Sequence, residues 1–220
     1  MVNGFFITGT DTDAGKTVFS AALMRLFASE GRCVAGLKPI ASGVESIDGA
    51  LENLDVLRLS QAANVCLPSE RINRYRFEPA IAPHIAANNE GVKLDLNAIN
   101  DDVSYAMTRA DTVVVEGVGG WLVPLDESHT IETLAILLNL PVILVVGLRL
   151  GCLNHALLTA QAIERSGVPF KGWVSNHVDP EFTSVVENIE TLESRMPVPR
   201  LYDLPHSQNL DECLLRRICR

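Results

Sequence analysis

The sequence predicts a single α/β domain built around a doubly wound, mainly parallel sheet. Three observations support this fold class. Apolar, β-branched runs recur along the chain, stretches with helical periodicity separate them, and a loop of small residues that ends in Gly-Lys-Thr joins the first run to the first helical stretch. A length of 220 residues suits one hydrophobic core, so we expect residues 1–220 to form one domain.

Six apolar runs are predicted strands. Most of them lack polar alternation, as expected of strands that are buried on both faces of a sheet. Because helical stretches separate the runs, crossover connections should bring them together as parallel neighbours. The predicted strands are Gly4–Thr8, Cys33–Lys38, Thr112–Glu116, Val142–Val146, Gly172–Asn176 and Arg200–Leu204.

Helical periodicity appears in the segments between these strands. One pattern starts near Gly15 and has a plausible C-terminal cap at Gly31, a second ends before Pro141, and a third ends before Gly167. The stretch from about residue 41 to residue 100 is less regular and holds one short helical pattern followed by three prolines. We interpret it as an irregular insertion near the carboxyl ends of the strands, where ligands of open α/β sheets bind.

Composition excludes several classes of protein. Hydrophobic residues make up 47% of the chain and charged residues 20%, which is too apolar for a disordered protein. The formal net charge of -9 disfavours a nucleic-acid binder, and no uninterrupted apolar run reaches the roughly 18 residues of a membrane span. The N-terminus lacks the features of a secretory signal. Five cysteines without a CxxC pair indicate reduced thiols in a reducing compartment.

The loop GTDTDAGKT, residues 9–17, is the strongest functional motif. Backbone N–H groups of such a loop and the positive end of the following helix can hold phosphates. The positively charged Lys16 side chain would contact the β- and γ-phosphates, and the Thr17 hydroxyl could bind Mg²⁺. A strict phosphate-loop pattern would have glycine where this chain has Thr10. The motif and its position nevertheless predict a P-loop NTPase-like domain.

Further polar residues follow other predicted strands. Glu116 ends an apolar strand before a glycine turn, an arrangement typical of the second metal ligand of a P-loop site. Asp55, at the start of a short helix, is a weaker candidate because a lone aspartate there is usually an N-cap. Lys38 ends the second strand and should point toward the ligand edge of the sheet.

Four motifs together resemble the dethiobiotin synthetases of biotin biosynthesis. They are GTDTDAGKT, GLKPIASG, VVVEGVGGWLVPL and PVILVVGLRLGCLNHALLTAQAI, in this order and with their spacing kept, and the similarity runs to about Pro205. The resemblance implies a cytoplasmic, homodimeric enzyme. Such an enzyme carboxylates and cyclises 7,8-diaminononanoate, using CO₂ and ATP with Mg²⁺.

The resemblance also implies roles for individual residues. The metal ligands would be Thr17, Asp55 and Glu116, and Lys38 and Lys16 would be the catalytic lysines. The diamine or its carbamate would contact Thr12 and Ser42, while Gly119 and Asn154 would help the neighbouring subunit to hold the long substrate. The nucleotide would be held by Asp13, Ala14, Gly15, Lys16, Thr17, Val18, Asp55, Glu116, Gly117, Val118, Gly119, Asn176, His177, Pro205, His206 and Ser207.

The implied mechanism needs no side-chain nucleophile. One amine of the diamine reacts with CO₂ to give a carbamate, and a carbamate oxygen attacks the γ-phosphoryl group. The second amine then closes the ureido ring and releases phosphate. Such a reaction requires alignment and positive charge, which Lys16, Lys38 and Mg²⁺ would supply.

The chain departs from the family pattern at its C-terminal end. His177 stands where the family often has an aspartate after the base-reading Asn176, and the residues after Pro205 fit only loosely. A neutral histidine offers one hydrogen-bond donor and one acceptor but no negative charge. We therefore expect ATP to be used but GTP or CTP also to support turnover. The basic tip CLLRRICR, residues 213–220, is interpreted as a solvated last helix.

Two other functions fit a P-loop domain. A partition- or septum-type ATPase switch would carry an additional lysine near the first glycines of its loop, where this chain has Thr10, Asp11 and Thr12. A small-molecule kinase would leave phosphate on its product. Analysis of the product therefore separates a kinase from a synthetase.

Overall fold

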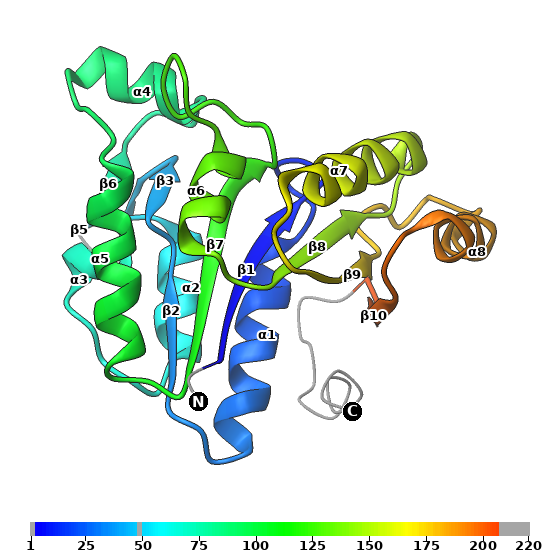
Figure 1. Ribbon diagram of the computed structural model, residues 1–220, viewed down its shortest axis with the longest axis horizontal. Coiled ribbons are helices and arrows are strands. Elements are labelled where there is room, and N and C mark those ends of the chain that lie inside the picture. Colours follow the sequence, from blue (N-terminus) through cyan, green and yellow to red (C-terminus); the bar gives the residue numbers. More distant parts are fainter. Residues whose placement is uncertain (1–2, 48–49, 207–220) are drawn as a thin grey trace.

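A computed structural model describes residues 3–47 and 50–206. Its main sheet has six strands in the order β10-β9-β8-β1-β7-β2, and every neighbouring pair is parallel (Figure 1). This confirms the predicted fold class and all six predicted strands to within a few residues. The strands are β1 (Asn3–Gly9), β2 (Val34–Leu37), β7 (Thr112–Gly120), β8 (Val142–Gly147), β9 (Phe170–Asn176) and β10 (Arg200–Leu204).

Helices cover both faces of this sheet, because side chains of the central strands alternate between two hydrophobic clusters. In β1, Phe6 packs into one cluster and Ile7 into the other. Helices α1 (Lys16–Ser29) and α2 (Leu54–Ala62) cover the Ile7 face. The Phe6 face is covered by α5 (Leu96–Met107), α6 (Ile131–Leu138), α7 (Cys152–Ser166) and α8 (Val185–Arg195), while α4 (Pro83–Glu90) packs on the small parallel sheet of the insertion. Within the described residues, no helix is long and apolar enough to cross a membrane.

The predicted insertion contains more regular structure than its sequence suggested. Besides α2 and α4 it holds two small sheets, one parallel and one antiparallel. Buried Asp102 of α5 ties this region to α5, since its carboxylate accepts hydrogen bonds from Arg71 and Arg74 of the insertion. The remaining elements here are β3 (Ile40–Ser42), β4 (Glu45–Ile47), β5 (Ala50–Glu52), α3 (Ser69–Ile72) and β6 (Tyr75–Phe77).

The order of the strands determines where a ligand can bind. The connection that leaves β1 leads to β2 on one side, whereas the connections that follow β8 lead to β9 and β10 on the other, so the direction of the connections reverses between β1 and β8. Ligands of open α/β sheets bind at such a point, outside the carboxyl ends of the strands. The loop after β1 and the ends of β2 and β7 all lie at this edge (Figure 1). The basic tip at residues 213–220 lies outside the described residues.

Candidate active site

The predicted phosphate loop joins β1 to α1, and its geometry requires a glycine at its end. Gly15 has a φ of 88°, and a Cβ there would lie 1.9 Å from Asn176 Nδ2. The same Asn176 amide donates to the Ala14 carbonyl at 2.9 Å, which ties the loop to the end of β9. No side-chain cap satisfies the first N–H groups of α1, so they remain available to an anion.

Lys16, the first residue of α1, lies inside the loop. Its ammonium donates to the Asp11 carbonyl at 2.8 Å. Burial, and next the positive charge of Lys38, lower the pKa of Lys16 to about 8. A polyphosphate bound in the loop would supply the negative charge that favours the ammonium form. The environment of Lys16 therefore suits a phosphate-binding lysine.

Lys38 forms the most buried charged contact of the site. Its ammonium lies 2.6 Å from Glu116 Oε1 and 2.7 Å from Asp55 Oδ2. Burial alone would lower the pKa of Lys38, but the two carboxylates outweigh that effect and raise it. Lys38 in turn helps to hold the pKa of Asp55 below its usual range, although burial of Asp55 acts in the opposite direction. The three residues come from β7, α2 and the end of β2, so the contact joins three elements.

The predicted metal ligands converge at the same place. Thr17 Oγ1 donates to Glu116 Oε1 at 2.7 Å, so this oxygen already accepts from both Thr17 and Lys38. The other carboxylate oxygen, Glu116 Oε2, is buried and has no hydrogen-bond partner among the described residues. A hydroxyl and two carboxylates are the oxygen ligands that Mg²⁺ prefers. The residues at this point therefore fit a magnesium ion.

Asn53 positions Asp55 at the site. Its side chain accepts hydrogen bonds from the backbone N–H groups of Asp55 and Val56 and so caps α2. The amide of Asn53 also donates to the carbonyls of Ser42 and Gly43, at 3.3 Å and 2.9 Å. One buried side chain thus positions both a metal-ligand candidate and the strand end that carries a substrate candidate.

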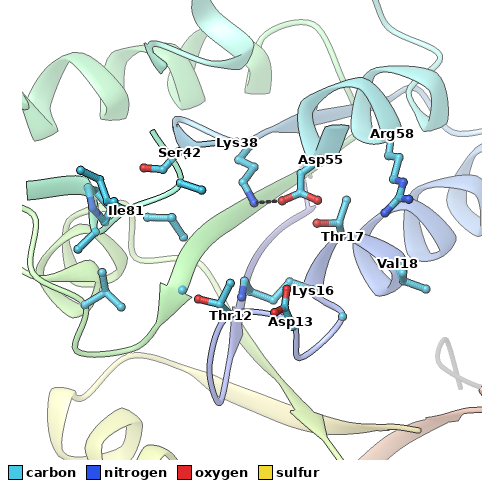
Figure 2. A pocket seen from close by; sticks show the side chains of 17 residues that line it. Thr12, Asp13, Lys16, Thr17, Val18, Lys38, Ser42, Asp55, Arg58 and Ile81 are labelled. Atoms are coloured by element: carbon cyan, nitrogen blue, oxygen red, sulfur yellow. Dashed lines mark hydrogen bonds and ion pairs between the residues drawn. The ribbon is translucent and has the colours of Figure 1, made fainter. Parts of the chain in front are cut away.

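A cavity of about 580 Å³ lies at this edge of the sheet. It brings together most of the predicted phosphate, metal and substrate residues. In Figure 2, Ser42 and Ile81 lie on one side of Lys38, and Arg58 and Val18 lie on the other. The predicted residues that line it are Thr12, Asp13, Gly15, Lys16, Thr17, Val18, Lys38, Ser42, Asp55, Val118 and Gly119.

Other lining residues were not predicted. The segment before and into α4 supplies an apolar wall, and Val123 adds to it. Only Pro83, at the first position of α4, carried a sequence signal, and that signal marks a helix start rather than a binding site. Arg58 could have been found, because it lies three residues after Asp55 in a predicted helix. The unpredicted lining residues are Arg58, Ala80, Ile81, Ala82, Pro83 and Val123.

The candidate base-reading residues lie at the ends of β9 and β10, outside this lining. The ring nitrogen Nε2 of His177 is 3.0 Å from Asp203 Oδ1, so a carboxylate contacts the histidine after all. Asp203 also accepts a hydrogen bond from Ser175. His206 Nδ1 lies 2.9 Å from the His177 carbonyl, next to Pro205. Ser207 lies outside the described residues.

Two further candidates do not line the cavity. Gly117 packs inside β7, where a Cβ would lie 3.2 Å from the Phe6 ring. Asn154, in the first turn of α7, is exposed. Asn154 is thus not placed at the cavity of its own chain, and its role toward a neighbouring subunit stays a prediction.

The sequence is similar to known proteins along almost its whole length. Residues 3–213 match the family model described as an AAA domain. The chain is 45% identical over 211 residues to the ATP-dependent dethiobiotin synthetase BioD of Nitrosospira multiformis, which covers 96% of this chain and 92% of the relative. It is 48% identical over 202 residues to the enzyme of the same name from Pseudomonas paraeruginosa. The aligned residues make up 91% of this chain and 89% of that relative.

Solved structures with the same fold are more distant in sequence. The septum site-determining protein MinD from Pyrococcus horikoshii OT3, solved with Mg-ADP, superimposes with a TM-score of 0.58 at 16% identity, covering 99% of this chain and 87% of that one. A ParA family ATPase from Chlorobium tepidum TLS superimposes with a TM-score of 0.59 at 14% identity, covering 94% of this chain and 86% of that one. At this identity the likeness supports the P-loop fold alone.

Gly15→Ala should abolish tight nucleotide binding, because the new methyl group would collide with the Asn176 amide and shift the loop. We expect the affinity for ATP, measured by calorimetry, to fall at least tenfold, or by about 1.4 kcal/mol. Gly31→Ala is the matched control, since Gly31 has a similar φ of 81° and no heavy atom within 4 Å of its Cβ position. Equal loss of ATP affinity in both variants would contradict the steric argument.

Proposed function

The chain belongs to the dethiobiotin synthetase family and catalyses the ATP-dependent ring closure that forms dethiobiotin, and we propose that the cavity at the carboxyl ends of β1, β2 and β7 is its active site. The observation that carries this proposal is the convergence of Lys16, Lys38, Thr17 and two carboxylates at one edge of the sheet. The 14–16% likeness to MinD and ParA proteins supports only the fold, so it does not favour a switch ATPase.

The phosphate loop forms the nucleotide end of the site. The N–H groups at the start of α1 and the Lys16 ammonium would hold the β- and γ-phosphates. When bound by Thr17, Asp55 and Glu116, Mg²⁺ would neutralise charge on the phosphate oxygens. The unpartnered Glu116 Oε2 supports this placement of the ion.

Lys38 would act where the phosphoryl group is transferred. Its side chain lies between the nucleotide end and the Ser42 end of the cavity (Figure 2). The two carboxylates keep it protonated, so it offers a fixed positive charge to the carbamate and to the phosphoryl oxygens. Its role is to align two anions that would otherwise repel each other.

The remaining part of the cavity would hold the diamine. Thr12 and Ser42 provide hydroxyl groups, and the Ser42 oxygen is buried without a partner among the described residues. Ile81, Pro83 and Val123 form an apolar wall beside them. Such a wall suits the hydrocarbon chain of diaminononanoate. An apolar wall also limits the access of water, which would otherwise hydrolyse a phosphorylated carbamate.

We also propose a homodimer in which the substrate lies near the interface. Three leucines, just before α7, in the loop after β7 and within α7, are exposed: Leu150 has 91% of its surface accessible, Leu122 59% and Leu158 58%. A groove of about 480 Å³ runs between the latter two. A second copy would cover these side chains and bring its Asn154 to the substrate. A cytoplasmic location agrees with Cys33, Cys66 and Cys152, which are unpaired within the described residues.

The reaction is tested by mass spectrometry of the product made from diaminononanoate, bicarbonate, Mg²⁺ and ATP. We expect a product heavier than the diamine by one carbonyl less two hydrogens, with ADP and free phosphate formed in step. A phosphorylated diamine as the end product would instead identify a kinase.

Replacing Lys16 and replacing Lys38 should impair the enzyme in different ways. Lys16→Ala removes a charge from the phosphate loop, so we expect weaker ATP binding together with lower turnover. Lys38→Ala removes a charge from the transfer site, so kcat should fall about 10²- to 10³-fold with a smaller change in ATP affinity. Equal loss of ATP affinity in the two variants would contradict this division of roles.

Base selectivity should be modest. Phosphate contacts are the same for every nucleoside triphosphate, and the His177 ring is already engaged by Asp203. We expect the preference for ATP over GTP or CTP, measured as kcat/KM, to be about 10- to 150-fold smaller in the wild type than an aspartate at position 177 would give, because one charge-assisted hydrogen bond to the base is lost. His177→Asp should also destabilise the fold, because it places a second carboxylate beside Asp203. A preference for ATP beyond about a thousandfold in the wild type would contradict this reading.

Sedimentation tests the dimer. We expect the active protein to sediment as a dimer at micromolar concentration, and Leu158→Glu to shift it toward the monomer with loss of turnover. Leu137→Glu, an exposed leucine on α6, is the matched control. A monomer with full activity would refute the proposed arrangement.

A further inference from the structure

Arg58 is a cation of the cavity to which the resemblance assigned no role. It lies on α2, three residues after Asp55, so both side chains leave the same face of the helix. Arg58 is exposed and lines the cavity together with Thr17 and Val18. Figure 2 shows its guanidinium group turned toward the start of α1.

Arg58 differs from the two lysines because no residue in the described part of the chain pairs with its charge. Lys16 donates to a backbone carbonyl, and Lys38 pairs with two carboxylates. No hydrogen bond or ion pair joins Arg58 to another residue in the ranges 3–47 and 50–206. A guanidinium group has five donors in a planar arrangement that matches two phosphate oxygens at once. An unpaired arginine in this position is available to an anionic ligand.

The position of Arg58 indicates which part of a nucleotide it would contact. In Figure 2 it lies on the far side of Asp55 from Lys38 and Ser42, where phosphoryl transfer is proposed. Its neighbours Thr17 and Val18 belong to the first turn of α1. The γ-phosphate must face Lys38 and the carbamate, so the phosphates nearer the ribose lie on the Arg58 side.

We propose that Arg58 binds the α- and β-phosphates of the nucleotide and sets the affinity of the enzyme for both ATP and ADP. This inference rests on the proposed function, since it requires the triphosphate to lie along the phosphate loop. Arg58 contacts the part of ATP that is not transferred. Binding there stabilises substrate and transition state equally, so it lowers KM for ATP and leaves kcat nearly unchanged.

The test measures the affinities of Mg-ATP and Mg-ADP by calorimetry in Arg58→Gln, Arg58→Lys and Arg25→Gln. Arg25 is an exposed arginine of α1 that does not line the cavity, and its variant is the matched control. We expect Arg58→Gln to weaken both nucleotides by about 5- to 20-fold, as for one partly exposed charge-assisted contact. Arg58→Lys should recover part of the loss, because lysine keeps the charge but loses the planar donor pair.

Kinetics and a second variant separate the outcomes. In Arg58→Gln, KM for ATP should rise by about the same factor while kcat stays within about twofold of the wild type. Unchanged affinity for both nucleotides would overturn the proposal, and a loss confined to ATP would overturn the assignment to the α- and β-phosphates. Lys16→Ala tests the underlying site. If Lys16→Ala leaves nucleotide affinity unchanged, the proposed position of the triphosphate is wrong, and the inference about Arg58 fails with it.

Discussion

The site depends on one buried charged contact, in which the Lys38 ammonium lies between Glu116 and Asp55 with only 5% of its side-chain surface exposed. Buried ion pairs contribute little net stability, but removing one partner leaves an uncompensated charge and typically costs about 3–5 kcal/mol. The contact of Lys38 with the two carboxylates therefore constrains the geometry of the site more than it stabilises the fold. It holds the end of β2, the end of β7 and the first turn of α2 at fixed positions, and every proposed role in the cavity refers to those positions.

The cations of the cavity are arranged along the expected path of the triphosphate. Arg58 lies at one end, Lys16 in the loop, and Lys38 at the end where Ser42 and the apolar wall begin. Phosphoryl transfer needs little covalent chemistry from a protein, so positioned charge and exclusion of water account for most of what a site must supply. MinD and ParA proteins share this fold at 14–16% identity, and a fold does not by itself specify a reaction, so the function is inferred from the cavity residues.

Much of this arrangement could be predicted from the sequence, because buried parallel strands are continuous apolar runs and the phosphate loop is a local motif. The contact between Lys38 and Asp55 could not, since the pairing depends on how α2 packs against the sheet. The sequence also missed α8, in which only Ile189 and Leu192 are buried, so its apolar pattern is sparse. The wall from Ala80 to Pro83 could not be predicted, because apolar residues in an irregular segment show no functional pattern before the fold is known.

The most direct test of this account is the magnesium dependence of turnover in Glu116→Gln. The substitution keeps the shape of the side chain but removes one charge partner of Lys38 and one proposed carboxylate ligand of Mg²⁺. We expect the Mg²⁺ concentration for half-maximal turnover to rise at least tenfold and kcat to fall about 10²- to 10³-fold, while the thermal midpoint shows that the protein remains folded. Wild-type turnover with an unchanged requirement for Mg²⁺ would contradict this account.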